Sequence, residues 1–268
     1  MLKDITMGQY FPGNSPVHRM DPRTKLLLLV GYIVALFTAE NLLSYLVVFA
    51  FLAITIAIST IPLKSIVSGM KPLVMILVFT GILNIFFTTG EKIAVRFWVI
   101  TIYWEGIVRA AFMMARILLL ITGTFLLTYT TSPIALTDGL ESLLGPMKKL
   151  RMPVHELAMM MCIALRFIPT LIEETDRIMS AQKARGADFE SGNLIQRVKA
   201  LVPILVPLFI SAFRRADELA VAMECRCYHG GDGRTKMKLL RYHLLDFKAF
   251  AAGVFMIGAV VALRILGL

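Results

Sequence analysis

Residues 41–63 read NLLSYLVVFAFLAITIAISTIPL, an uninterrupted run without a charged side chain. Because a helix needs about 20 mostly apolar residues to cross a bilayer, this run predicts a membrane-spanning helix. Four further uncharged runs lie at residues 26–39, 72–90, 117–137 and 249–263. The sequence therefore predicts an all-α, polytopic membrane protein with about five transmembrane helices.

Residues beside two of these runs affect how long the predicted spans are. Arg23 and Lys25 precede the short first run, and their long side chains can reach the lipid headgroups. The fourth helix is expected to begin before Arg116, near Gly106. Residues 96–104, which precede it, are aromatic and rich in β-formers. They predict an interfacial belt or a short extended loop, and stacking on a ligand is the competing interpretation.

The composition excludes a soluble domain. Of 268 residues, 57% are hydrophobic and only 17% are charged, and the mean hydropathy is +0.75. Soluble domains carry about 25% charged residues, so this chain has too few polar side chains to cover a soluble globule. The net charge of +10 alone would suit nucleic acid, anionic lipid or an acidic protein. The hydropathy favours the bilayer, and we expect no nucleic acid partner.

The cysteines and the N-terminus indicate a cytosolic redox environment. Cys162, Cys225 and Cys227 are odd in number, and none has the two-residue gap of a CxxC motif. They are interpreted as reduced thiols on the cytosolic side. Residues 1–25 are charged and contain three prolines, without the apolar core of a signal peptide, so the chain is expected to insert by its own spans.

Basic side chains accumulate in alternate connections between the spans. Four precede the first span, two separate the second from the third, and 17 lie in residues 132–248. The opposite connections hold Glu40 and two basic residues balanced by two acidic ones. Since Lys and Arg concentrate on the cytoplasmic side, we expect the N-terminus and residues 132–248 in the cytoplasm and the C-terminus outside, in the cell (plasma) membrane.

Three segments follow from this topology. Residues 1–131 hold the N-terminal tail and transmembrane helices 1–4. Residues 132–246 form a cytoplasmic region of amphipathic coupling helices, without a Gly/Ser-rich linker. Residues 247–268 form the C-terminal transmembrane helix.

Two long amphipathic helices are predicted inside the cytoplasmic region. Polar residues punctuate residues 155–185 at helical spacing, and Pro169 predicts a kink or break there. A second run extends from residue 194 to residue 226, before a glycine-rich stop at Gly230.

The two helices resemble each other when Arg185 is aligned with Arg226. Chance similarity between amphipathic helices is the competing interpretation. The matched pairs are Asp176 and Asp217, Ile178 and Leu219, Ala181 and Ala222, Ala184 and Cys225, Arg185 and Arg226, and Gly186 and Cys227.

Both helices thus end in an arginine between two small residues. Small neighbours would let the helix end enter a groove, where the guanidinium of Arg185 or Arg226 presents five hydrogen-bond donors. The sequence predicts two docking tips. For either arginine alone, the competing interpretation is a side chain without a docking role that faces solvent or lipid phosphate.

The sequence lacks the residues expected for ion-coupled transport and for ATP hydrolysis. The predicted spans contain no Asp, Glu or His, which an ion-coupled transporter would be expected to need. Asn84, inside a span, is interpreted as a helix–helix hydrogen bond. The chain has no GxxxxGK[ST] loop, so any ATPase must be a partner.

The spacing of the histidines and cysteines does not indicate a metal site either. The four histidines are scattered, and the stretch from Cys225 to His229 would place its cysteines on different sides of a helix. The sequence predicts no catalytic residue, no cofactor and no metal site in this chain.

With these residues in view, the chain resembles the transmembrane T component of energy-coupling factor transporters, which are ABC-type importers of vitamins and trace metals. Residues 8–15 (GQYFPGNS) and 18–25 (HRMDPRTK) resemble the opening signature of that family. Ala184-Arg185-Gly186 matches the first of its two Ala-Arg-Gly motifs, and Cys225-Arg226-Cys227 occupies the second. Because cysteines replace Ala and Gly there, we expect the helix-ending glycine at Gly230 or Gly231 instead.

The resemblance implies a function and a set of partners. The chain would link ATP hydrolysis by two EcfA-type ATPase subunits, usually a heterodimer, to vitamin or micronutrient uptake through a membrane-embedded S component. The two triplets would dock on the ATPases, and the long helices would form the platform for the S component. A membrane scaffold or receptor without ATP-driven transport is the alternative.

Overall fold

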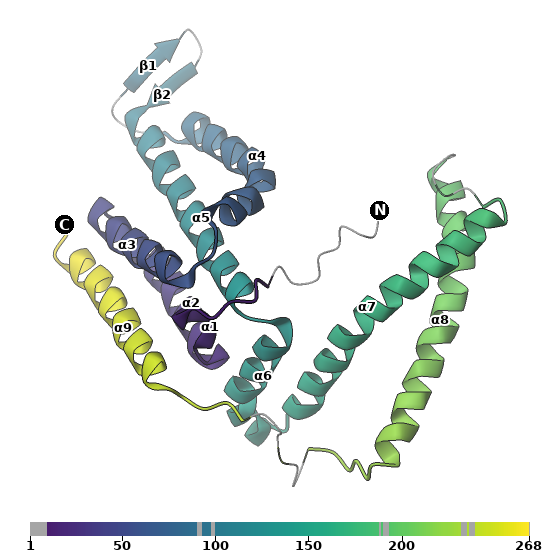
Figure 1. The fold of residues 1–268 in the computed structure, drawn as a ribbon. Helices are drawn as coiled ribbons and strands as arrows, with labels where there is room; N and C mark the ends of the chain where they lie inside the picture. Colours follow the sequence, from purple (N-terminus) through teal and green to yellow (C-terminus); the bar gives the residue numbers. More distant parts are fainter. Residues whose placement is uncertain are drawn as a thin grey trace. The chain divides into compact units, whose positions relative to one another are not determined.

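The computed structural model describes residues 10–89, 93–97, 100–187, 189, 193–231, 235 and 239–267 of the 268-residue chain. Helices dominate, which confirms the all-α prediction (Figure 1). The elements in chain order are α1 (Pro16–Arg19), α2 (Pro22–Thr38), α3 (Leu42–Ser59), α4 (Leu63–Phe87), β1 (Ile93–Phe97), β2 (Ile100–Tyr103), α5 (Trp104–Thr130), α6 (Pro133–Leu144), the 3₁₀ helix η2 (Gly145–Leu150), α7 (Val154–Ala184), α8 (Leu194–Glu224) and α9 (Leu244–Ile265).

A short hairpin joins α4 to α5. Strands β1 and β2 pair antiparallel, with Arg96 opposite Thr101 and Phe97 opposite Ile100. Residues 96–97 and 100–103 are thus extended, as one of the two expectations had it, and the interfacial belt and the stacking on a ligand stay predictions. Helix α5 then begins at Trp104, well before Arg116, as the sequence predicted.

The chain divides into two compact units. One contains Gly8–Gly139 together with Leu240–Leu268, and the other contains Leu140–Leu239. The first unit is a helical bundle built around α2, which contacts α3, α5 and α9. The second unit holds η2, α7 and α8.

Close helix packing defines the core of the bundle. Tyr32 and Leu36 of α2 are buried, and they cluster with buried side chains of α3, α5 and α9. The Tyr32 hydroxyl donates a hydrogen bond to the Leu119 carbonyl of α5 at 2.9 Å, which satisfies a polar group inside an apolar core. A Cβ atom at Gly253 of α9 would meet Cδ2 of Leu28, so the glycine permits the close approach of α9 to α2.

Five of the described helices are long and apolar enough to cross a membrane: α3, α4, α5, α7 and α9. Four of them contain or overlap the predicted spans that begin at residues 41, 72, 117 and 249. The predicted span 26–39 lies in α2, which has 17 residues, about 26 Å of helix. Helix α7 is apolar enough by composition because charged side chains are sparse before Glu173. The number of candidate spans among the described helices agrees with the predicted five. The set differs, because α7 is included and α2, which holds the predicted span 26–39, is not.

Helices α7 and α8 form a long antiparallel pair (Figure 1). An ion pair joins them, with Nη2 of Arg215 3.2 Å from Oε2 of Glu174. Helix α7 continues through Pro169 without ending, so the proline is not a break. Helix α8 likewise continues through its two prolines, Pro203 and Pro207.

Candidate functional site

The end of α7 places Arg185 in a defined helix-terminating turn. Arg185 is the C-cap residue, and Gly186 follows it in the left-handed conformation with φ of +87°. The backbone N–H of Gly186 donates to the Lys183 carbonyl, and that of Ala187 donates to the Gln182 carbonyl, both at 3.0 Å. These two hydrogen bonds are the Schellman motif, which satisfies carbonyls that the helix itself leaves free.

The end of α8 repeats this turn residue for residue. Cys227 is left-handed with φ of +55°, and its N–H donates to the Glu224 carbonyl at 2.9 Å. The N–H of Tyr228 donates to the Met223 carbonyl at 3.1 Å. Arg226 therefore occupies the same place in its turn as Arg185 does at the end of α7. The backbone supports the predicted repeat of the two helix ends.

The expected shift of the helix-ending residue to Gly230 or Gly231 is wrong. Cys227 itself takes the left-handed position that Gly186 takes in α7. A side chain in this conformation costs roughly 1–2 kcal/mol relative to glycine, because Cβ crowds the neighbouring backbone. The turn therefore keeps its geometry at an energetic cost that the α7 turn does not carry.

Both arginines are available to a partner. All three residues of each triplet, from Ala184 to Gly186 and from Cys225 to Cys227, are exposed. Neither guanidinium has a hydrogen bond or ion pair within the part of the chain that the structure describes. Two positive charges at negative helix ends are favourably placed, and each keeps its five donors for a docking surface.

The structure does not bring the two triplets together. Because α7 and α8 are antiparallel, Arg185 and Arg226 lie at opposite ends of the pair (Figure 1). Helix α8 alone has 31 residues and is about 46 Å long. One small binding site cannot hold both arginines, so they are two separate candidate docking points.

Helix α8 also exposes an unusually apolar surface between the two points. Large apolar side chains with exposed fractions of 46–68% run along most of its length. They are Ile195, Val198, Leu201, Val202, Leu205, Val206, Phe209, Ile210, Phe213 and Val221. Such a surface marks a lipid or protein contact, since water alone would leave it uncompensated.

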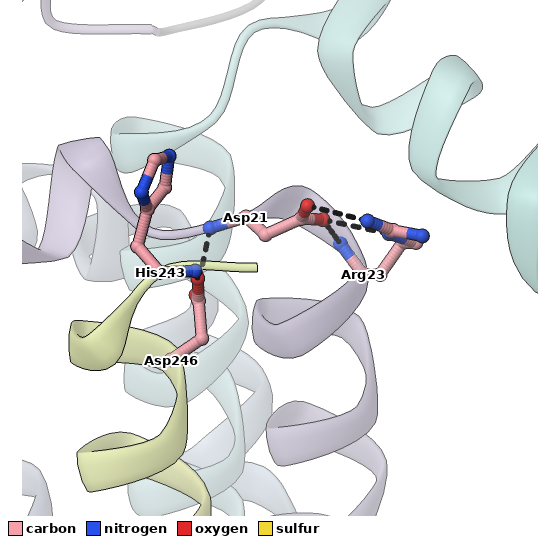
Figure 2. A network of polar contacts seen from close by, with 4 residues as sticks. All are labelled: Asp21, Arg23, His243 and Asp246. Atoms are coloured by element: carbon pink, nitrogen blue, oxygen red, sulfur yellow. Dashed lines mark hydrogen bonds and ion pairs between the residues drawn. The ribbon is translucent and has the colours of Figure 1, made fainter. Parts of the chain in front are cut away.

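A second polar cluster, which the sequence analysis gave no role, holds the bundle together (Figure 2). Asp246 of α9 is fully buried and accepts two backbone hydrogen bonds, from Asp21 at 2.9 Å and from His243 at 2.7 Å. Asp21 in turn caps α2 and receives a forked pair of hydrogen bonds from Arg23. The Arg23 guanidinium also lies 4.1 Å from the ring centre of Tyr242.

The electrostatics of this cluster favour the charged form of Asp21. Burial alone would raise the pKa of Asp21. The hydrogen bonds from the side chain and backbone of Arg23, together with its positive charge, outweigh that effect and hold the pKa below its usual value. The cluster therefore joins the beginnings of α2 and α9 through a charged, fully hydrogen-bonded contact.

Lys25 extends the same cluster to α5. Its buried ammonium donates to the Thr130 carbonyl at 2.9 Å and to Oγ1 of Thr131 at 3.1 Å, at the end of α5. The signature HRMDPRTK is thus a structural junction of three helices. A signal for it was present in the sequence, since Asp followed by Pro predicts a helix N-cap and first turn.

The described residues offer no reaction centre among these groups. No three His, Cys, Asp or Glu side chains in the described ranges lie together as metal ligands. The interpretation of Asn84 as a helix–helix contact agrees with its position, since Nδ2 lies 3.1 Å from Sδ of Met113 in α5.

Comparisons with known proteins point to one family. A family model described as "CbiQ: Cobalt transport protein" matches residues 13–237. A protein of Clostridium kluyveri is 57% identical over 250 residues, 93% of both chains. A protein of Thermosediminibacter oceani is 53% identical over 262 residues, 97% of this chain and 98% of its own. One of Bacillus subtilis is 50% identical over 240 residues, 90% and 91% of the two chains. All three are named energy-coupling factor transporter transmembrane protein EcfT.

Proposed function

Because this chain belongs to the CbiQ family and, within it, to the EcfT transmembrane proteins of energy-coupling factor transporters, we propose that it couples ATP hydrolysis by two partner ATPase subunits to uptake of a vitamin or other micronutrient. The substrate would enter through a separate, membrane-embedded S component. The chain itself would not hydrolyse ATP.

The observation that carries this proposal is the pair of equivalent helix ends. Arg185 and Arg226 each sit at the C-cap of a Schellman turn, exposed and without an acidic partner among the described residues. One arginine would enter a groove on each ATPase subunit. A planar guanidinium can donate a forked pair of hydrogen bonds to a carboxylate or to carbonyl groups there.

The helix pair would carry ATPase movement into the membrane. A helix transmits a push along its axis because its backbone hydrogen bonds keep its length nearly constant. The ion pair between Glu174 and Arg215 joins the two helices at one point, so displacement of one helix would move the other. The exposed apolar surface of α8 would then serve as the platform on which the S component rests.

The charges of the connections fit this arrangement. The N-terminus and the region of α7 and α8 would face the cytoplasm, where the ATPases and ATP are found, and the C-terminus would face outside. The 17 basic side chains of residues 132–248 support this orientation.

Alanine substitution of the two arginines tests the proposal. Arg185→Ala and Arg226→Ala are expected to insert normally and to lose ATP-driven uptake. Removing one partner of a buried charged hydrogen bond typically costs about 2–5 kcal/mol, so ATPase binding should weaken more than tenfold per site. Lysine should rescue poorly because it lacks the planar fork.

Arg177 provides the matched control. It is exposed and lies on α7, away from the terminating turn, so Arg177→Ala should leave uptake and co-purification of both ATPases close to normal. If both tip variants transport at the unaltered rate and retain both ATPases, the coupling role of the tips is wrong. If the unaltered chain itself does not co-purify with any ATPase subunit, the alternative of a membrane scaffold is favoured instead.

A further inference from the structure

We propose that Cys225 and Cys227 form a thiol-modification site that controls docking of the Arg226 tip. A mixed disulfide with a small thiol that carries carboxylates would block the contact between this tip and its ATPase. The inference rests on the proposed function, because it assumes that the tip docks there.

The two thiols flank the docking arginine and can be reached from solution. Both Cys225 and Cys227 are exposed. The α7 tip has Ala184 and Gly186 at the same places in an equivalent turn. Only one of the two docking points can therefore be modified in this way, although the backbone of the two points is alike.

The position of Cys227 is also an energetic anomaly. Its left-handed φ of +55° favours glycine, yet the chain carries a thiol there. Packing does not explain the thiol, because the side chain is exposed. An exposed, strained residue beside a docking group points to a role for the side chain itself.

The reaction is thiol–disulfide exchange. The thiolate of Cys225 or Cys227 attacks one sulfur of a small disulfide, forming a new S–S bond as the original S–S bond breaks. The departing small thiolate carries the electron pair and takes up the proton that the cysteine lost. The cysteine is oxidised to the disulfide level, and half of the reagent is reduced to a thiol. A second exchange with a dithiol restores the free cysteine.

The adduct would disable the tip in two ways. It adds bulk at a point where the flanking residues must be small to enter a groove. Its carboxylates also lie beside Arg226, where they can occupy the donors that would otherwise bind the ATPase. We expect the modified chain to bind the ATPase pair at least tenfold more weakly.

Glutathione disulfide provides the probe. The purified full-length chain is treated, freed of reagent, analysed by mass spectrometry for adducts and titrated with the ATPase pair. We expect adducts at Cys225 or Cys227, weakened binding, and full recovery after dithiothreitol. An adduct at these residues that leaves the affinity unchanged would refute the inference, and so would failure of both residues to react.

Two variants make the assignment specific. In Cys225→Ala/Cys227→Gly, the second triplet acquires the sequence of the first, and its affinity should be the same before and after treatment. Cys162→Ala removes the half-buried cysteine of α7 and should keep the sensitivity of the unaltered chain. If Arg226→Ala weakens binding and the adduct does not, this inference fails while the proposed function stands. If Arg226→Ala binds normally, the proposed function fails.

Discussion

Cys227 and Gly186 hold the same backbone conformation at the same place in two turns, and only one of them is suited to it. Replacing Cys227 by glycine removes the crowding of Cβ but makes the unfolded chain more flexible, so the two effects partly cancel. We expect Cys227→Gly to stabilise the folded chain by up to about 1 kcal/mol. Gly186→Ala, the reverse change, should destabilise it by up to about 1 kcal/mol, because the same two effects oppose each other there. Thermal unfolding in detergent measures both, and shifts of the same sign would contradict this account of the turns.

Asp246 is the residue on which the junction of α2 and α9 depends. Asp246→Ala leaves the backbone N–H of Asp21 without its acceptor in a buried place, and that of His243 without its acceptor in a part-buried one. A buried unsatisfied donor costs about 1–3 kcal/mol, and water can replace the acceptor of the part-buried one, so the free energy of unfolding should fall by about 1–3 kcal/mol. Thermal unfolding and yield of inserted protein measure the effect. Glu40→Gln, at an exposed ion pair with Arg264, is the control and should cost less than about 1 kcal/mol. Equal losses would show that burial at Asp246 is unimportant.

The sequence singled out the two arginines as candidate docking residues but did not predict the conformation of the turn at Cys227. The arginine between small residues could be recognised at both helix ends. The left-handed Cys227 could not, because glycine is so strongly preferred there that Gly230 and Gly231 were the better candidates. The partners of Asp21 also escaped prediction. Its contact with Asp246 spans 225 positions, and no local pattern reports so distant a pairing.

Helix α7 is long and apolar enough to cross a membrane, so whether it does so has to be tested. We expect it not to do so, because its most apolar window has a mean hydropathy of 1.4 against 1.9–2.5 in α3, α4, α5 and α9. Single cysteines at Met152 and Lys183, before and after the most apolar part, test this in a chain without native cysteines. A membrane-impermeant maleimide should label both only after the cells are opened. Labelling of the Lys183 position in intact cells would place that end outside.

Helix boundaries were largely predictable from periodicity and from charges. The end of α2 and the start of α3 flank Glu40 and Asn41, which is where the predicted runs 26–39 and 41–63 meet. The expected alternative of a break at Pro169 is wrong, because a proline inside a long helix can be tolerated at the loss of one backbone hydrogen bond, and the alternative of a kink stays a prediction. The position of α2 in the bundle could not be predicted from the sequence. Its central place in the bundle comes from packing against α3, α5 and α9, which hydropathy alone does not report.

For the whole molecule, the distribution of basic residues predicts one orientation. Reporter fusions should place the N-terminus in the cytoplasm and the C-terminus outside, because five crossings put the two ends on opposite sides. The physical reason is the cost of moving the 17 basic side chains of residues 132–248 across the membrane. A cytoplasmic C-terminus would contradict the five-crossing topology. A fusion after residue 239, between the two units, serves as an internal reference and should report the cytoplasm.

The antiparallel course of α7 and α8 has a consequence for symmetry. Two similar helices that run in opposite directions are related by a half-turn about an axis perpendicular to both. The repeated helix end therefore gives a single, asymmetric chain a local pseudo-twofold axis, with Arg185 and Arg226 as the two equivalent points. Two parallel copies would be related by translation and could not match a partner built around a twofold axis. The proposed pair of ATPases would thus meet equivalent contacts on one polypeptide, and the cysteines beside Arg226 are where that equivalence is broken.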